Sequence, residues 1–265
     1  MAICKNCDNH YPDFNAYCPY CSQKTGVHRL NVQAVLHEGV HYFTHTDKGV
    51  FKLFRDLISK RGVIAREYVE GKRKKHFPPF TFFLIVAGIL LFVFSKPQFN
   101  IPIDLADKTS ILKISDPIEK VNELAKYRRE TEASQFIVRY FNYFAILSLP
   151  VKAFAFWLFY RRKYNFVENL VAGMYMLGFC LFAYAVLFLP SVYLLGVRKE
   201  YAAYGFLALQ LFYFTSFYNG FLGNTRKRQF IKSFLVSGFS LIFWMFISSL
   251  PTKLYIENGF WGMLE

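Results

Sequence analysis

Four cysteines near the start of the chain have the spacing of a metal site. Cys4 and Cys7 form one C-x-x-C pair, and Cys18 and Cys21 form a second pair ten residues later. Thiolates are soft ligands, and two such pairs can occupy the four corners of a tetrahedral ion such as Zn²⁺. We therefore expect one structural zinc ion, held by these four residues, with no open position for catalysis.

The stretch HEGVH at residues 37–41 matches the H-E-x-x-H pattern of zinc peptidases. On a helix, His37 and His41 would share a face that could hold a second metal. A catalytic zinc also needs a third protein ligand, and no second motif announces one. His45 lies roughly 12 Å along such a helix from His37, too far to share an ion. We therefore interpret HEGVH as part of a membrane-surface helix and keep the peptidase as an alternative.

Two ionisable residues lie within or at the start of apolar segments. Lys152 and Glu168 belong to consecutive segments that would form a helical hairpin, and Asn169 follows Glu168. Ionisable groups inside a bilayer are costly and are candidates for function. We expect an ion pair between Lys152 and Glu168 near the inner membrane surface, with Asn169 alongside. The alternatives are a lysine that snorkels to the interface and a glutamate exposed there.

The composition indicates which elements position these residues. The chain has 265 residues, of which 54% are hydrophobic and 20% aromatic, with a formal net charge of +14. A soluble nucleic-acid-binding domain of this charge would not normally be so apolar. The sequence therefore predicts an all-α integral membrane protein. Its five expected transmembrane helices cover residues 79–95, 137–160, 167–189, 201–222 and 230–250.

Basic clusters alternate between the ends of these segments. The first span is preceded by the run Lys72, Arg73, Lys74 and Lys75, and later clusters lie at 161–163 and 226–228. Positive residues stay in the cytoplasm, so we expect the N-terminus inside and the C-terminus outside, in the periplasm. The outer loop, 96–135, contains a predicted helix with Asp116 as its N-cap and Pro117 at its first position. The expected location is the bacterial inner membrane.

A basic linker connects the predicted zinc ribbon (1–26) to the membrane domain (77–265). Within the linker, 27–76, apolar residues repeat at helical spacing and basic residues occupy the other face. The apolar positions are Val50, Leu53, Phe54, Leu57 and Ile58, and the basic ones are Lys48, Lys52, Arg55 and Lys60. Such a helix either lies in the membrane interface, on anionic lipid, or packs against the ends of the chain's own spans. Arg55 and the run 72–75 are therefore our candidate membrane-surface or partner-binding residues.

Several motifs in the first third of the chain resemble one bacterial family. They are "CSQK" at the end of the ribbon, "HTDKGVFKLFRDL" in the linker, and "REYVEGKRKKHFPPFTFFL" before the first span. Together they resemble domain-of-unknown-function family 3667, which implies an inner-membrane protein with an N-terminal zinc ribbon and implies no activity. Two positions depart from the family pattern. Ser22 stands where glycine commonly follows the last cysteine, and Arg61 stands where a Pro-Gly turn commonly precedes Gly62.

These features favour a non-enzymatic adaptor or accessory protein. Its structural zinc ribbon and basic surface would dock a partner at the membrane: another membrane protein or complex, anionic lipid, the ribosome or a second copy of the chain. A transporter or lipid-handling protein is the second hypothesis, and the H-E-x-x-H peptidase is the third. Cys180, within an apolar run, is interpreted as a small core residue.

Overall fold

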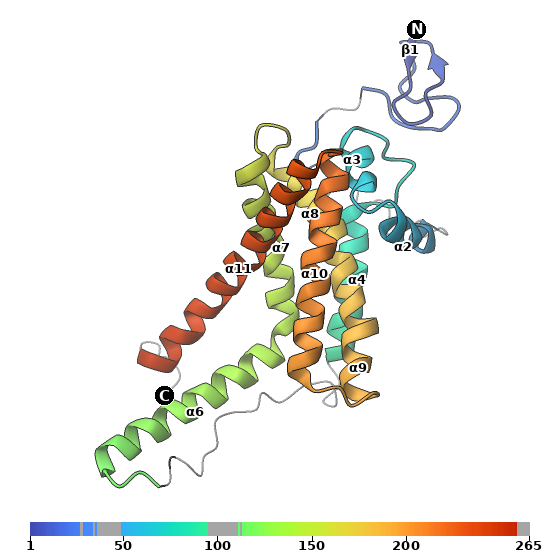
Figure 1. Ribbon diagram of the computed structural model, residues 1–265. Helices are drawn as coiled ribbons and strands as arrows, with labels where there is room; N and C mark the ends of the chain where they lie inside the picture. Colours follow the sequence, from blue (N-terminus) through green and yellow to red (C-terminus); the bar gives the residue numbers. More distant parts are fainter. Residues whose placement is uncertain (27–28, 34, 36–48, 95–110, 112, 259–265) are drawn as a thin grey trace.

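The computed structural model describes residues 1–26, 29–33, 35, 49–94, 111 and 113–258. These residues are almost entirely helical, apart from a small strand pair in the ribbon, where β1 pairs antiparallel with β2. The ribbon lies at one end of an elongated helical bundle (Figure 1). The strands and helices are β1 (Ala2–Ile3), β2 (His10–Tyr11), α2 (Gly49–Ser59), α3 (Val63–Val69), α4 (Pro79–Phe94), α6 (Pro117–Arg139), α7 (Phe141–Tyr160), α8 (Phe166–Ala183), η2 (Tyr184–Phe188), α9 (Leu189–Tyr193), α10 (Lys199–Leu222) and α11 (Lys227–Asn258).

Three helical stretches in the described chain are long and apolar enough to cross a membrane. They are Tyr143–Tyr160 in α7, Phe166–Tyr193 formed by α8, η2 and α9, and Lys227–Glu257 in α11. They correspond to the second, third and fifth predicted spans, and they are compatible with a membrane protein. The first and fourth predicted spans form α4, a shorter apolar helix, and α10. Five crossings and their orientation stay predictions.

The bundle core consists mainly of aromatic rings between α7, α8 and α10. Phe156 of α7 stacks on Tyr218 of α10, with ring centroids 3.5 Å apart. Gly178 of α8 allows α4 to approach closely, since a Cβ there would lie 2.7 Å from the Phe82 ring. Gly178 therefore permits close packing of α4 against α8. Cys180 is fully buried in this core, as expected.

The helix predicted in the outer loop is confirmed as α6. It begins at Pro117, and the Asp116 side chain accepts a hydrogen bond of 3.0 Å from the backbone N–H of Ile118. Tyr140 separates α6 from α7 and has non-helical backbone angles, φ −107° and ψ 16°. The predicted second span, 137–160, therefore contains a break near its start.

The linker helix α2 packs against the chain's own helices. Leu53 and Leu57 are buried, and the ring of Phe54 lies 4.2 Å from that of Phe182 in α8. Of the two placements left open by the sequence, intramolecular packing is the one observed for this face. Phe51 remains exposed, and so does Ile58, which the sequence had placed on the packed apolar face.

Candidate metal centre and basic surface

The four cysteines predicted as metal ligands lie together in the ribbon. Their Sγ atoms are all within 4.8 Å of one another. The Sγ–Sγ distance is 3.6 Å between Cys4 and Cys21 and 3.7 Å between Cys7 and Cys18. A tetrahedral ion with Zn–S bonds of about 2.3 Å requires Sγ–Sγ distances of roughly 3.8 Å. The four thiols are therefore close enough to hold a metal ion.

The two C-x-x-C turns share one backbone conformation. The N–H of Asp8 donates to the carbonyl of Cys4, and the N–H of Ser22 donates to the carbonyl of Cys18, each over 2.9 Å. Asp8 and Ser22 have φ values of 61° and 55°, in the left-handed region that favours glycine. The repeat in the sequence is thus also a repeat in the structure, and it presents two similar pairs of sulfur atoms to one point.

The thiols of the cluster differ in their affinity for protons. Burial raises the pKa of the Cys4 thiol to about 12. The backbone N–H of Asn9 lowers the pKa of Cys7 to about 7. Because the thiolate is the ligand form, metal binding at this site displaces protons, above all from Cys4.

The ribbon is hydrogen-bonded to the basic loop that follows α3. The Gln23 side chain is buried; its Nε2 donates to the carbonyl of Gly71, and its Oε1 accepts from the N–H of Lys74, each over 3.1 Å. Asn6 Oδ1 accepts from the N–H of Lys75, also over 3.1 Å. We call these three bonds the ribbon–loop contact. They join residues about 50 to 70 positions apart in the sequence and attach the basic run to the ribbon.

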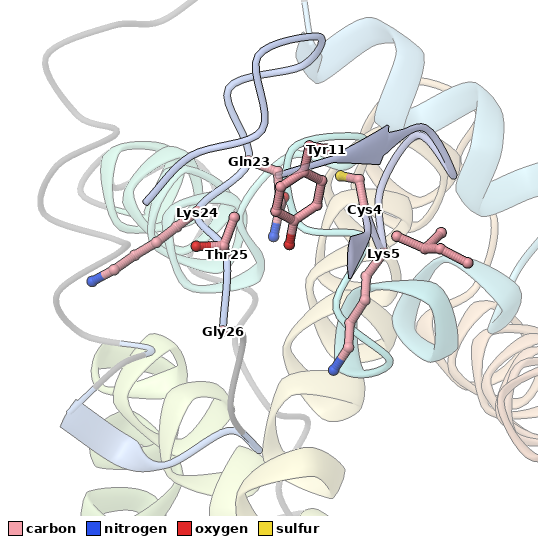
Figure 2. Close-up of a pocket in the computed structure, with 8 residues that line it drawn as sticks. Cys4, Lys5, Tyr11, Gln23, Lys24, Thr25 and Gly26 are labelled. Carbon is pink, nitrogen blue, oxygen red and sulfur yellow. The ribbon is translucent and has the colours of Figure 1, made fainter. Parts of the chain in front are cut away.

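A pocket on the ribbon lies beside this contact. Figure 2 shows Tyr11 and Gln23 between its two walls, one carrying Cys4 and Lys5 and the other the segment Lys24–Gly26. The side chains of Lys5 and Lys24 extend from these walls in different directions (Figure 2). The ribbon thus adds lysines of its own to the basic character of the neighbouring loop.

The basic run is only partly neutralised. Lys75 donates to both carboxylate oxygens of Glu67, at 2.9 and 2.8 Å, and His76 Nε2 lies 2.6 Å from Glu67 Oε2. Lys74 is exposed and Lys72 is half-buried, and neither has an acidic partner among the described residues. The candidate surface residues Lys72 and Lys74 therefore carry the charge that the run offers to a partner.

Glu168 pairs with Arg29, which corrects the expected ion pair with Lys152. Arg29 Nε and Nη2 donate to the two carboxylate oxygens of Glu168 at 2.7 and 2.9 Å. Glu168 also accepts from the backbone N–H of Asn165 and so completes a capping box at the start of α8. The Lys152–Glu168 pair is wrong because the segment after the ribbon returns to α8 and supplies a nearer cation.

Lys152 lies instead in the middle of the bundle. Its Nζ donates to Ser148 Oγ over 3.3 Å and lies within 6 Å of the ring centroids of Phe214 and Trp244. Asn169 is fully buried between α8 and α10, where it donates to the Asn165 carbonyl over 2.9 Å. Lys152 therefore lies in a different environment from Glu168, whereas Asn169 shares the partner Asn165 with Glu168.

The comparisons with known proteins concern the part of the chain just after the ribbon. Residues 47–91 match the family model described as Protein of unknown function (DUF3667). The resemblance inferred from the sequence motifs is confirmed over that segment. Searches of curated proteins and of solved structures found no match.

The segment that matches DUF3667 contains α2, α3, the basic loop and most of α4. It packs along the bundle mainly through α8 and α10. At Gly62, just before α3, a Cβ would lie 1.8 Å from the carbonyl oxygen of Phe217 in α10, so only glycine fits this approach. The Tyr213 hydroxyl donates to the carbonyl of Leu57 over 3.3 Å. The matched residues thus pack on the ribbon side of the bundle through α3 and along its length through α4 (Figure 1).

Both departures from the DUF3667 pattern lie at positions with left-handed backbone. Ser22 has φ 55° and Arg61 has φ 46°. Glycine adopts this region without a Cβ penalty, which explains why the family uses glycine-containing turns there. At both positions this chain forms the left-handed turn with a residue other than glycine.

The remaining predicted site residues are placed as follows. Arg55 is exposed on α2. His37 and His41 lie outside the described residues, as does Lys48. The second metal and the peptidase hypothesis therefore stay untested predictions.

The sequence did not identify Gln23, Asn6 and Arg29 as functional residues. Gln23 stood in the "CSQK" motif, which was the one available signal that its side chain has a specific partner. Asn6 and Arg29 are ordinary polar residues in short loops, and their partners lie 69 and 139 positions away. No local pattern could have indicated these contacts.

Proposed function

We propose that this protein is a non-enzymatic adaptor of the bacterial inner membrane. Its bundle crosses the membrane five times, through α4, α7, the α8–α9 stretch, α10 and α11, with the ribbon in the cytoplasm and the C-terminus in the periplasm. The ribbon holds one structural Zn²⁺ through Cys4, Cys7, Cys18 and Cys21. The length and apolarity of three of these helices and the positions of the basic clusters support this reading.

Zinc is the metal that this donor set fits best. Four thiolates favour a soft ion with tetrahedral geometry, and a reducing cytoplasm keeps them available. With all four positions filled by protein, the ion would stabilise the ribbon and take part in no reaction. Its role would be to keep Asn6 and Gln23 in place for the ribbon–loop contact.

The ribbon–loop contact is the observation that carries the proposal. It fixes the backbone of Lys74 and Lys75 to a metal-stabilised unit, so the cations at positions 72 and 74 are presented on a rigid surface. A rigid basic surface binds an acidic partner with a smaller loss of conformational freedom than a flexible run does. The partner we favour is an acidic face of another membrane protein or complex.

Site-specific crosslinking in cells tests the adaptor role. A photoreactive residue in place of Tyr20 on the exposed ribbon surface should give one major crosslinked species, and Lys72→Glu/Lys74→Glu should reduce it at least fivefold. Gln23→Ala should reduce it less, since it releases the loop without changing its charge. Lys113→Glu/Lys126→Glu near and on α6, with the same charge change, is the matched control and should have no effect.

The identity of the crosslinked species separates the hypotheses. Crosslinking to an acidic membrane protein would support the proposal. Crosslinking to a ribosomal protein or to a second copy of the chain would show that the proposed partner is wrong. Equal crosslinking in Lys72→Glu/Lys74→Glu and wild type would overturn the role of the basic loop.

Metal content of the purified protein tests the zinc assignment. We expect one zinc ion per chain in the wild type and in a His37→Ala/His41→Ala variant, and none in Cys18→Ser. Two ions in the wild type, falling to one in the histidine variant, would favour the peptidase.

A transporter or lipid-handling protein is the second hypothesis, and a cavity lined by Lys152, Glu168 and Gln210 would favour it. Glu168 is held by Arg29 at the start of α8, and Lys152 lies between aromatic rings of α10 and α11. These separate partners give no support to a site shared by Lys152 and Glu168. A lipid-related role is supported by a different surface, the exposed face of α2.

A further inference from the structure

The exposed face of α2 combines cations with large apolar side chains. Lys52 and Arg55 are exposed and have no acidic partner among the described residues, and Lys60 is exposed beside Asp56. Phe51 and Ile58, on the face of α2 that carries Lys52 and Arg55, are 86% and 62% exposed, and Lys60 directly follows the helix. Cations next to exposed apolar side chains are the pattern of a helix that lies at the boundary between lipid headgroups and acyl chains.

This face lies well below the ribbon-side end of the bundle. Arg61, directly after α2, lies over the ring of Phe212, which is ten residues and therefore roughly 15 Å from the end of α10 at Leu222. Phe54 contacts Phe182, roughly 24 Å along α8 from its start. In Figure 1, α2 accordingly lies lower along the bundle than α3, beside the start of α4.

The opposite side of the bundle exposes apolar side chains closer to the ribbon-side end. On α11, which begins at Lys227, Ile231 and Phe234 are exposed about 6 and 10 Å from its start, together with the cation Lys232. On α7, which ends at Tyr160, Leu158 and Phe159 are exposed. Exposed apolar side chains thus begin nearer the ribbon beside α7 and α11 than they do at α2.

The apolar surface of α4 begins beside α2. Phe54 of α2 contacts Phe82, which lies three residues after the start of α4 at Pro79, with ring centroids 5.5 Å apart. Leu84 and Ile89, further along α4, are exposed. The cations of α2 therefore lie next to the start of an apolar helix surface.

We propose that the exposed face of α2 is a binding site for anionic phospholipid headgroups. The site lies deeper in the membrane than the headgroup layer beside α11. Lys52, Arg55 and Lys60 bind the phosphodiester groups, and Phe51 and Ile58 insert among the adjoining acyl chains. The lipids held here lower the headgroup layer to the start of α4. The site rests on the proposed membrane insertion of the bundle, and it is separate from the ribbon–loop surface.

Fluorescence quenching in vesicles tests the site. The background variant replaces Trp157, Trp244 and Trp261 by Phe, and one reporter is then introduced, either Phe51→Trp on α2 or Phe246→Trp on α11. Each purified full-length chain is reconstituted in dioleoyl phosphatidylcholine. Quenching is measured with phosphatidylcholine or phosphatidylglycerol brominated at acyl carbons 6 and 7, and with aqueous iodide.

The reporter at position 51 should be quenched by brominated phosphatidylglycerol with a preference of roughly fivefold over brominated phosphatidylcholine. Lys52→Gln/Arg55→Gln/Lys60→Gln should abolish the preference while the helical circular dichroism is unchanged. The matched control, Arg226→Gln/Lys227→Gln/Arg228→Gln, removes three exposed cations from the ribbon-side end and should retain it. The reporter at position 246 should be quenched equally by both lipids.

The two reporters separate the ways in which the idea can fail. If position 246 is quenched by bromolipid but position 51 responds only to iodide, α2 faces water and the headgroup site is overturned. If position 51 is quenched without lipid preference, the cations do not bind headgroups and the site is equally overturned. If neither reporter responds to bromolipid, membrane insertion itself, and with it the proposed function, is wrong.

Discussion

The ribbon and the helical bundle of this protein are stabilised by different means. The ribbon buries little apart from Cys4, Tyr11 and Cys18, whereas the bundle buries a continuous aromatic core. A unit as small as the ribbon cannot bury enough apolar surface to fold alone. We therefore expect the ribbon to depend on the proposed metal and the bundle to fold without it. Among the described residues, the contacts of Asn6, Gln23 and Arg29 link the ribbon and the segment after it to the rest of the chain.

Removal of the metal should have the largest effect, and it should unfold the ribbon without unfolding the bundle. Structural zinc contributes on the order of 10–16 kcal/mol to such domains. Chelation of zinc, or Cys18→Ser, should therefore remove hydrogen-exchange protection from residues 1–26 while α8 and α10 keep theirs. Cys180→Ala, which removes a cysteine from the bundle core, should leave the metal in place. Retained protection of the ribbon after complete loss of zinc would contradict the distinction.

The link at the start of α8 should have the next largest effect. Glu168→Gln removes the ion pair with Arg29 and weakens the capping box, so we expect a loss of roughly 1–3 kcal/mol in the free energy of unfolding. Denaturant titration in mixed micelles measures it. Glu200→Gln is the matched control, since Glu200 is an exposed first-turn glutamate paired with Arg198, and it should change stability by less than about 0.5 kcal/mol.

Acidification should loosen the loop after α3 and leave the bundle unchanged. Burial lowers the pKa of His76 below 6.5, although Glu67 beside it acts in the opposite direction. His76 therefore takes up a proton at a higher pH in the unfolded loop than in the folded one. The folded loop loses stability as the pH falls below about 6.5.

Glu67 extends this loss to lower pH. Burial alone would raise the pKa of Glu67, but hydrogen bonds from Lys75 and His76 hold it below 4.5. The contribution of Glu67 to the stability of the folded loop is present above pH 4.5 and is lost as the pH falls through the lowered pKa of Glu67. Hydrogen exchange at residues 71–75 should show both steps, and His76→Gln should remove the upper one. A pH-independent exchange rate, after correction for intrinsic chemistry, would be the contrary result.

The smallest effects are expected at the two left-handed positions. Ser22→Gly and Arg61→Gly should each stabilise the protein by up to about 1 kcal/mol, since glycine adopts positive φ freely. Arg61→Gly should gain less, because it also loses the contact with Phe212. Ser59→Gly, at the end of α2, should have the opposite sign, and thermal unfolding compares the three. A destabilised Ser22→Gly would show that the serine side chain has a role of its own.

The predictions that succeeded depended on local sequence. The four cysteines converge because each pair lies within one short turn, the first closed by β1 and β2 and the second by the Tyr17–Lys24 bridge. Asp116 and Pro117 mark the start of α6 because helix caps involve neighbouring residues. Apolar segments formed helices because hydropathy is a sum over consecutive residues. The expected ion pair of Lys152 was wrong for the converse reason: no local pattern indicated that Arg29 would reach Glu168.

The sequence by itself determined the composition of the metal centre, the helical character of the chain and the positions of its apolar segments. These follow from residue spacing and hydrophobicity over a few turns. Only the tertiary structure decided which polar groups meet, namely Gln23 with the loop after α3 and Arg29 with Glu168. It also decided that α2 lies beside the start of α4. Such contacts depend on how distant segments are brought together by packing, for example at Gly62. Neighbouring residues alone do not determine which distant segments come into contact.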